Sequence, residues 1–292
     1  MEDYNILLTC EHGGNDVPDE YRHLFEDAHH VLETHRGWDI GILPFAEVMA
    51  KILRAPLLSS TVSRLLVELN RSLGHRQLFS EFSTRLPHDA RRELLQKYYF
   101  PHREMVSQAV QNARAYGRVY HITVHSFTPE LNGHVRNADI TFLYDYRRKS
   151  EATLAKYWQA LLQQKLPVRV RRNYPYRGHT DGLESALRKH WQEKDYVGLC
   201  VEVNQKHLVD GFPEEWPVIV SQTLRESLAL LNQIVTSQSG GSTGCESSVE
   251  AGTGPPAYQT EAGGVEAGRD ERFTEAGLLA EDGVGYGGAH TL

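Results

Sequence analysis

Four polar side chains lie at or near the ends of apolar stretches of the sequence. His12 follows NILLTC, His125 ends YHITVH, Glu202 lies within GLCVEVN, and Asp39 precedes a stretch with helical spacing. Reactive groups are commonly placed on loops that a rigid sheet holds in position. Two imidazoles and a carboxylate leave one coordination position of zinc open, and a second carboxylate can act as a base. Together these residue types predict a hydrolytic zinc site.

Each of the four residues also has an ordinary structural explanation. The chain contains 15 His, so two near strand ends can be a coincidence. Asp39 can be a helix N-cap, a position that Asp favours. Glu202 can pair with an Arg of the core, because a carboxylate within an apolar strand is costly unless it is paired or coordinated. Taken together, the four residues favour the metal site. His121 lies on the same strand face as His125, and we expect it to support that site or the core.

Two further segments have side chains that suit an anionic ligand. Asn70 and Arg71, in VELNRS, offer N–H donors for a carboxylate, although a lone Arg more often forms a surface salt bridge. The segment RRNYPYRGHTDGL, residues 171–183, combines aromatic residues, glycines and Arg177. Its composition favours a shaped loop over a pocket rather than a plain surface turn.

Strand-like and helix-like patterns alternate along residues 1–237. The segment GILPFAEVMAKILR, for example, places Ile42, Phe45 and Met49 on one helical face. Such alternation predicts an α/β three-layer sandwich with a mostly parallel, mixed sheet. The expected strands are residues 5–10, 55–60, 120–125, 140–145, 168–172 and 197–204, and the expected helices are residues 41–54, 89–117 with a break near Pro101, 150–166 and 214–235.

The composition separates a balanced domain from an acidic C-terminal segment. The chain has 292 residues, 40% of them hydrophobic and 24% charged, which is ordinary for a globular protein. Residues 238–292 are rich in Gly, Ser and Glu and lack an apolar period, so we predict that they are disordered. From Ser239 onward acidic residues outnumber basic ones by seven, which accounts for the net charge of −7. The remainder shows no basic excess of the kind that nucleic-acid binding requires.

Cysteine usage and hydropathy indicate a cytoplasmic protein. Cys10, Cys200 and Cys245 are scattered without CxxC spacing, so no disulfide framework is expected. The N-terminal MEDYN lacks the pattern of a signal peptide. No apolar run approaches the roughly 20 residues of a membrane span. We therefore expect no membrane partner.

Six separated segments, in order, resemble the N-formylglutamate amidohydrolase family, and the match extends over nearly all of residues 1–237. The segments are residues 5–21, THRGWDIG, VSRLLVELNRS, HITVHSFTP, NYPYRGHTDGL and VEVNQ. The resemblance implies the phosphorylase/hydrolase-like fold of the zinc carboxypeptidases. It also implies Zn²⁺-dependent hydrolysis of N-formylglutamate, or a similar N-formyl amino acid, to formate and the amino acid. In relatives this reaction completes one route of histidine degradation.

The resemblance refines the metal site. Zinc carboxypeptidases present His-x-x-Glu just before a helix, whereas the residue three after His12 is Asn15, a poor ligand. A helix is expected after Asp39 instead, so Asp39 stands where the carboxypeptidase Glu would. The expected ligands are therefore His12, Asp39 and His125, and Asn15 or Asp16 is the next candidate for the third position.

The resemblance also implies roles for the remaining candidates. Glu202 would be the base, Asn70 and Arg71 would hold the α-carboxylate of the substrate, and Arg136 or Arg177 could reach a second carboxylate. The expected partner is thus a small acidic N-acyl amino acid. Two alternatives remain at this stage: a zinc deacylase or carboxypeptidase acting on another N-acyl amino acid, and a non-catalytic relative that binds acidic ligands. The residues leave the oligomeric state open.

Overall fold

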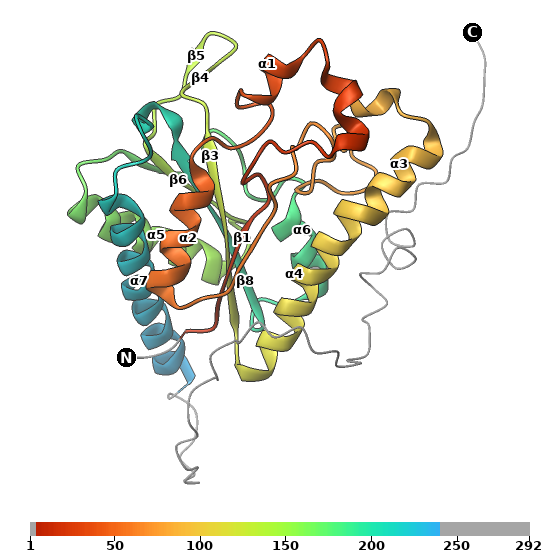
Figure 1. The fold of residues 1–292 in the computed structure, drawn as a ribbon. Coiled ribbons are helices and arrows are strands. Elements are labelled where there is room, and N and C mark those ends of the chain that lie inside the picture. Colours follow the sequence, from red (N-terminus) through yellow and green to blue (C-terminus); the bar gives the residue numbers. More distant parts are fainter. Residues whose placement is uncertain (1–3, 240–292) are drawn as a thin grey trace, which may run out of the picture.

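The apolar strand-like stretches pair into one six-stranded sheet (Figure 1). The computed structural model describes residues 4–239. The strand order is β2-β1-β3-β8-β6-β7. The first four of these strands are parallel, whereas β6 runs antiparallel to β8 and parallel to β7. The strands of the sheet are β1 (Ile6–Cys10), β2 (Leu57–Ser59), β3 (Val119–Phe127), β6 (Ile140–Leu143), β7 (Val170–Arg172) and β8 (Tyr196–Asn204). A separate hairpin consists of β4 (Glu130–Leu131) and β5 (His134–Val135).

Helices cover both faces of this sheet. Figure 1 shows α2, α5 and α7 on one side, and α4 and α6 on the other. The helices are α1 (His29–Leu32), α2 (Ile42–Leu53), α3 (His88–Leu94), α4 (Phe100–Ala113), α5 (Lys149–Lys165), α6 (Leu183–His190) and α7 (Glu215–Ser239). The arrangement confirms the predicted α/β sandwich with a mostly parallel, mixed sheet. None of the helices described is long and apolar enough to span a membrane.

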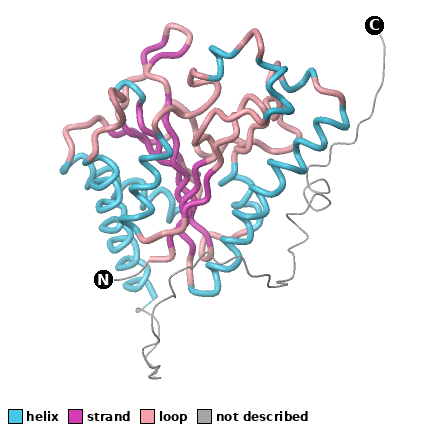
Figure 2. Tube along the Cα trace, viewed as in Figure 1, coloured by secondary structure: helices cyan, strands magenta, loops and turns pink. Residues whose placement is uncertain are grey.

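The central strands have one apolar face and one polar face. Ile122 and Val124 of β3 belong to the core that α2, α5 and α7 cover. The alternating residues His121, Thr123 and His125 face the other way, as expected for a strand with a side-chain period of two. Figure 2 shows the loops gathered at the top of the view, beyond one end of the magenta strands. Polar residues therefore line one face of the sheet where it meets these loops.

The structure differs from the expected elements in a few places. The helical segment around Pro101 is not broken, because a π-helical turn at Leu95–Tyr99 joins α3 to α4. Pro101 lies directly after this π-helical turn, in the first turn of α4. The short helix α6 and the β4–β5 hairpin were not predicted. The predicted disordered segment, residues 238–292, lies almost wholly outside the described residues, apart from the last residues of α7.

Candidate active site

Three adjacent parallel strands bring the predicted site residues together. In the pairing of β3 with β8, His125 lies directly opposite Glu202. His12 follows β1, which pairs with β3 on its other side. The Asp39 amide donates to the His12 carbonyl at 3.0 Å, which fixes the loop before α2 against the end of β1. Residues far apart in the sequence thus meet at one end of the sheet.

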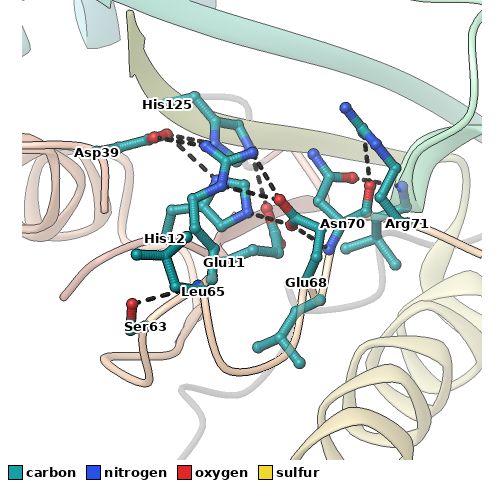
Figure 3. Close-up of polar contacts among 12 residues, drawn as sticks. Glu11, His12, Asp39, Ser63, Leu65, Glu68, Asn70, Arg71 and His125 are labelled. Atoms are coloured by element: carbon teal, nitrogen blue, oxygen red, sulfur yellow. Dashed lines mark hydrogen bonds and ion pairs between the residues drawn. The ribbon is translucent and has the colours of Figure 1, made fainter. Parts of the chain in front are cut away.

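His12, Asp39 and His125 form a buried cluster (Figure 3). One potential ligand atom from each residue lies within 4.8 Å of the others. Oδ2 of Asp39 is 2.8 Å from Nδ1 of His125 and 3.4 Å from Nδ1 of His12. Neither alternative for the third position is in this cluster, since Asp16 is exposed and Asn15 donates to the Leu32 carbonyl at 3.1 Å.

Asp39 does not cap the helix that follows it. The residue before α2 is Gly41, with a φ of 76°, and no side chain caps the helix. The Asp39 carboxylate points instead toward the two histidines and Arg64, whose Nη1 lies 3.2 Å from Oδ1. The structure therefore does not support the N-cap explanation.

Two glycines after His12 allow the loop to approach the segment after β2 closely. The Gly13 amide donates to the Ser60 carbonyl at 2.9 Å. A Cβ atom at Gly14 would lie 2.8 Å from the Thr61 carbonyl and from its Cβ, closer than real Cβ atoms come. Position 14 therefore requires glycine. The close approach places His12 beside the segment that leads toward Glu68.

Glu68 and Arg64 complete a ring of side chains with His12 and Asp39. Oε1 of Glu68 lies 2.5 Å from Nε2 of His12, and Oε2 accepts from Arg64 Nη2 at 2.6 Å. Arg64 reaches Asp39 with its other terminal nitrogen. Because Glu68 occupies Nε2 of His12, the imidazole of His12 presents its Nδ1 to the cluster. Neither Glu68 nor Arg64 was predicted, although a Glu within the apolar run RLLVEL is a signal that a buried carboxylate has a partner.

Burial and neighbouring charges act in opposite directions on the pKa values of the two carboxylates, Asp39 and Glu68. Burial would raise the pKa of Asp39, but His12 and His125 hold it well below its ordinary value. Burial would raise the pKa of Glu68 as well, yet Arg64 and His12 hold it below its usual range. Both carboxylates are therefore ionised at neutral pH, which favours binding of a cation.

Glu202 is a buried carboxylate with no basic partner in hydrogen-bond contact among residues 4–239. Its Oε2 has no hydrogen-bond partner there, and Oε1 is 4.0 Å from the Cys200 thiol. Burial raises the pKa of Glu202 to about 7. The expected alternative, a pairing with a core Arg, is not what the structure shows. A carboxyl group with a pKa near neutrality suits a residue that accepts and returns a proton.

A cavity of about 390 Å³ opens beside this cluster. Its lining includes His12, Asp39, His125, Glu202, Arg71 and Arg177. The same cavity is therefore lined by the three potential ligands, the unpaired carboxylate and three arginines, of which Arg64 is the third.

Two turns of the chain hold Arg71 at the wall of the cavity. Nη1 of Arg71 donates to the carbonyls of Asn70 and Asp181, and the Ser72 amide donates to the Asp181 carboxylate at 3.0 Å. Asn70 Oδ1 accepts from the Leu183 amide at 2.6 Å, at the start of α6. Asn70 thus ties the loop before α6 to Arg71 while it also lines the cavity.

The two candidates for binding a second carboxylate lie in different surroundings. Arg177 lines the cavity, and its side chain is exposed. Arg136 is buried, donates to the Tyr176 hydroxyl at 2.7 Å, and is not among the residues that line the cavity. The geometry therefore favours Arg177 over Arg136 for direct contact with a ligand.

Most of the chain matches a known protein family. The model of the N-formylglutamate amidohydrolase family matches residues 4–209. The chain belongs to this family. Membership confirms the resemblance seen in the sequence, and it indicates a hydrolase. No curated protein matches the chain.

Two solved structures share the fold of this N-formylglutamate amidohydrolase family member. A gene product of Agrobacterium tumefaciens is 24% identical with a TM-score of 0.64, over 81% of this chain and 92% of that one. N-formylglutamate amidohydrolase from Ralstonia eutropha is 17% identical with a TM-score of 0.56, over 82% of this chain and 96% of that one. At these identities the likeness establishes the fold alone.

The donor set of the family member fits a zinc ion. Nδ1 of His12 is buried and has no hydrogen-bond partner within residues 4–239. In a tetrahedral site with bonds of about 2.0–2.2 Å, neighbouring donor atoms lie about 3.4 Å apart. The Nδ1 atoms of His12 and His125 lie at 3.4 and 2.8 Å from Oδ2 of Asp39, close to that spacing. Two imidazoles and one carboxylate are also a donor set that catalytic zinc sites use.

The remaining candidate, His121, belongs to the core. Its Nε2 lies 2.9 Å from the Thr9 hydroxyl and its Nδ1 lies 2.8 Å from the Tyr196 hydroxyl. Burial lowers the pKa of His121 to about 4, so the ring is neutral at physiological pH. Both nitrogens are occupied, and His121 supports the sheet rather than the cluster.

Proposed function

We propose that this protein hydrolyses an N-formyl amino acid, with N-formylglutamate as the preferred substrate, and that the reaction depends on zinc. His12, Asp39 and His125 would hold the metal, which supplies Lewis acidity and lowers the pKa of a water from about 15.7 toward 7. The observation that carries the proposal is the buried His12–Asp39–His125 cluster with Glu202 opposite His125 on the neighbouring strand.

Glu202 is the proton carrier in this reaction. It takes one proton from the attacking water as the water oxygen bonds to the formyl carbon. It then gives that proton to the amide nitrogen while the C–N bond breaks, so that formate and the free amino acid leave. The raised pKa of Glu202 supports both transfers, because proton transfer is most effective when the pKa of the group lies near the working pH.

Arg71 and Arg177 supply the positive charge that an acidic substrate requires. Arg71 is fixed by the Asn70 and Asp181 carbonyls, which leaves its remaining N–H groups for the α-carboxylate. Arg177, at the exposed part of the cavity wall, would hold the side-chain carboxylate of glutamate. Asn70 lies next to Arg71 and keeps the loop that contains Arg177 in place.

An activity screen of the purified protein tests this proposal. The substrates are N-formyl-, N-acetyl- and N-succinylglutamate, together with N-formylalanine. We expect the highest kcat/KM for N-formylglutamate, and loss of turnover after treatment with a chelator, restored by zinc. Preference for an acetyl or succinyl group would make the protein a deacylase of another N-acyl amino acid. Binding without turnover of any substrate would identify a non-catalytic relative.

A further inference from the structure

A further buried carboxylate, Glu11, lies next to the cluster. Glu11 has no exposed surface, and it immediately precedes His12 at the end of β1. Its Oε2 lies 2.9 Å from Nε2 of His125, and its Oε1 lies 3.7 Å from Nε2 of His102 on α4. Neither oxygen accepts a hydrogen bond of regular geometry within residues 4–239. Two imidazoles are thus the groups that face this carboxylate.

This environment is costly for a carboxylate that serves packing alone. Taking a charged group out of water is unfavourable unless hydrogen bonds or opposite charges compensate for it. The buried carboxylate of Glu151 shows such compensation, because it pairs with Arg188 and accepts from the Gly198 amide. Glu11 has neither kind of partner, so its position points to a task that involves the histidines.

Contacts on both ring nitrogens determine how His125 is presented. Nδ1 of His125 faces Oδ2 of Asp39 at 2.8 Å, on the side of the cavity. Nε2 faces Glu11 on the opposite side of the ring at 2.9 Å, a distance within reach of a hydrogen bond although the angles are not those of a regular one. A carboxylate on one ring nitrogen keeps the proton there and leaves the other nitrogen free to bind a metal.

We propose that Glu11 is a positioning residue that holds the proton of His125 on Nε2 and thereby presents Nδ1 to the metal. His102 stabilises the other oxygen of Glu11 from α4. The inference rests on the proposed function, because it gives Glu11 a task toward one of the proposed ligands. It makes the pair Glu11–His125 equivalent to the pair Glu68–His12, so that each histidine is oriented by its own carboxylate.

The variant that tests the proposal is Glu11→Gln, which keeps the shape and removes the charge. Loss of a carboxylate behind a histidine ligand typically weakens metal binding by about 10–100-fold. We expect a decrease of this size in zinc affinity, measured by competition with a chromophoric chelator. Asp145→Asn is the matched control: Asp145 is also buried, but it pairs with Arg147 and not with the cluster. Its zinc affinity should equal that of the wild type.

A purely structural role for Glu11 predicts a different result. If Glu11 only ties β1 to α4 through His102, both Glu11→Gln and His102→Gln should lower the melting temperature without changing zinc affinity. Under our proposal zinc affinity falls mainly in Glu11→Gln, whereas His102→Gln, which keeps a donor near Glu11, changes it by a few-fold at most. Equal zinc affinities of Glu11→Gln and wild type would overturn the proposal.

A measurement on the wild-type protein keeps the test independent of whether the variant folds. In nitrogen-15 spectra of the zinc-loaded protein, His125 should show a proton on Nε2 that exchanges slowly with water. A proton on Nδ1 instead would contradict the proposal. If the wild-type protein binds no zinc, the proposed function fails. The same spectrum of the untreated protein still tests the role of Glu11. That role is contradicted if the proton on Nε2 of His125 is not protected from exchange.

Discussion

The fold contains two clusters of largely buried charged side chains, and they differ in how completely their polar atoms are paired. The first consists of Glu151, Arg148 and Arg188. Glu151 accepts from the Asp145 and Gly198 amides and from Arg188, and both arginines also donate to backbone carbonyls. Each charged group in this cluster therefore has fixed partners, although Nε of Arg148 has only the ion pair with Glu151.

The cluster at the cavity is incompletely paired by the same criterion. Within residues 4–239, Nδ1 of His12 and Oε2 of Glu202 have no hydrogen-bond partner. Nδ1 of His12 and Glu202 belong to residues that line one cavity. Buried polar atoms are nearly always paired, so a set of unpaired ones at a single cavity indicates groups reserved for a ligand. The comparison teaches that the pairing of buried charges, more than their number, separates a binding site from a structural cluster.

The largest expected effect is on turnover. Glu202→Gln leaves the shape of the site but removes the proton carrier, so kcat for N-formylglutamate should fall by about 10²–10⁴-fold. Zinc content should stay the same, because Glu202 is not one of the proposed ligands. Steady-state kinetics and elemental analysis of the same preparation measure both quantities. Loss of zinc in this variant would make Glu202 a ligand instead.

The paired cluster should respond in the opposite way. Glu151→Gln leaves the charges of Arg148 and Arg188 without their carboxylate, and breaking a buried pair in this manner costs about 3–5 kcal/mol of unfolding free energy. Chemical denaturation measures this loss. The folded fraction should bind zinc as the wild type does. Reduced zinc affinity with unchanged stability would remove the distinction between the two clusters.

A smaller effect is expected where the cavity binds the substrate. Hydrogen bonds to charged groups contribute about 1.5–3 kcal/mol, so Arg71→Lys should raise KM by about 10–100-fold. The increase should be similar for N-formylglutamate and N-formylalanine, since both have an α-carboxylate. Arg177→Ala is the matched comparison, and it should raise KM for N-formylglutamate only. An equal effect of Arg177→Ala on both substrates would show that it does not bind the side-chain carboxylate.

The last expected effect is on the pH dependence of stability. Burial raises the pKa of Glu202 from 4.5 to about 7, so ionising this carboxyl costs folding free energy. The cost is absent below the unfolded-state pKa, grows as pH rises toward 7, and is constant above it. After removal of metal, the melting temperature of Glu202→Gln minus that of the wild type should therefore increase between pH 4.5 and 7 and then level off. A flat difference would mean that Glu202 titrates as an exposed carboxyl does.

The sequence predicted the sheet well because its signals are local. Alternation of apolar and polar residues identified the strands of the central sheet and the face of His125 and Glu202. The hydrogen-bonded turns that hold Arg71 were not predictable, because Asp181 and Leu183 meet Asn70 and Ser72 only through the tertiary fold. The same is true of the ring that Arg64 closes: its contact with Glu68 is local, but Arg64–Asp39 and His12–Glu68 join separate loops.

The choice of Asp39 as third ligand illustrates where the sequence alone was insufficient. From the sequence, Asn15 and Asp16 were closer to His12 and remained candidates. Distance along the chain does not decide between these candidates, because the Asp39 amide donates to the His12 carbonyl and returns the loop to the end of β1. The structure places Asp39 between the two histidines and leaves Asp16 exposed.

The zinc content of three proteins tests the central claim most directly. Wild type, Asp39→Asn and Asp16→Asn are purified in parallel without chelator, and bound zinc is measured by elemental analysis and by titration. We expect one zinc per chain in the wild type and in Asp16→Asn, and zinc affinity lowered by more than about 10-fold in Asp39→Asn, which substitutes a weak neutral oxygen for a charged ligand. Equal zinc affinity in all three proteins, or full hydrolysis of N-formylglutamate by a wild-type protein without metal, would contradict the account.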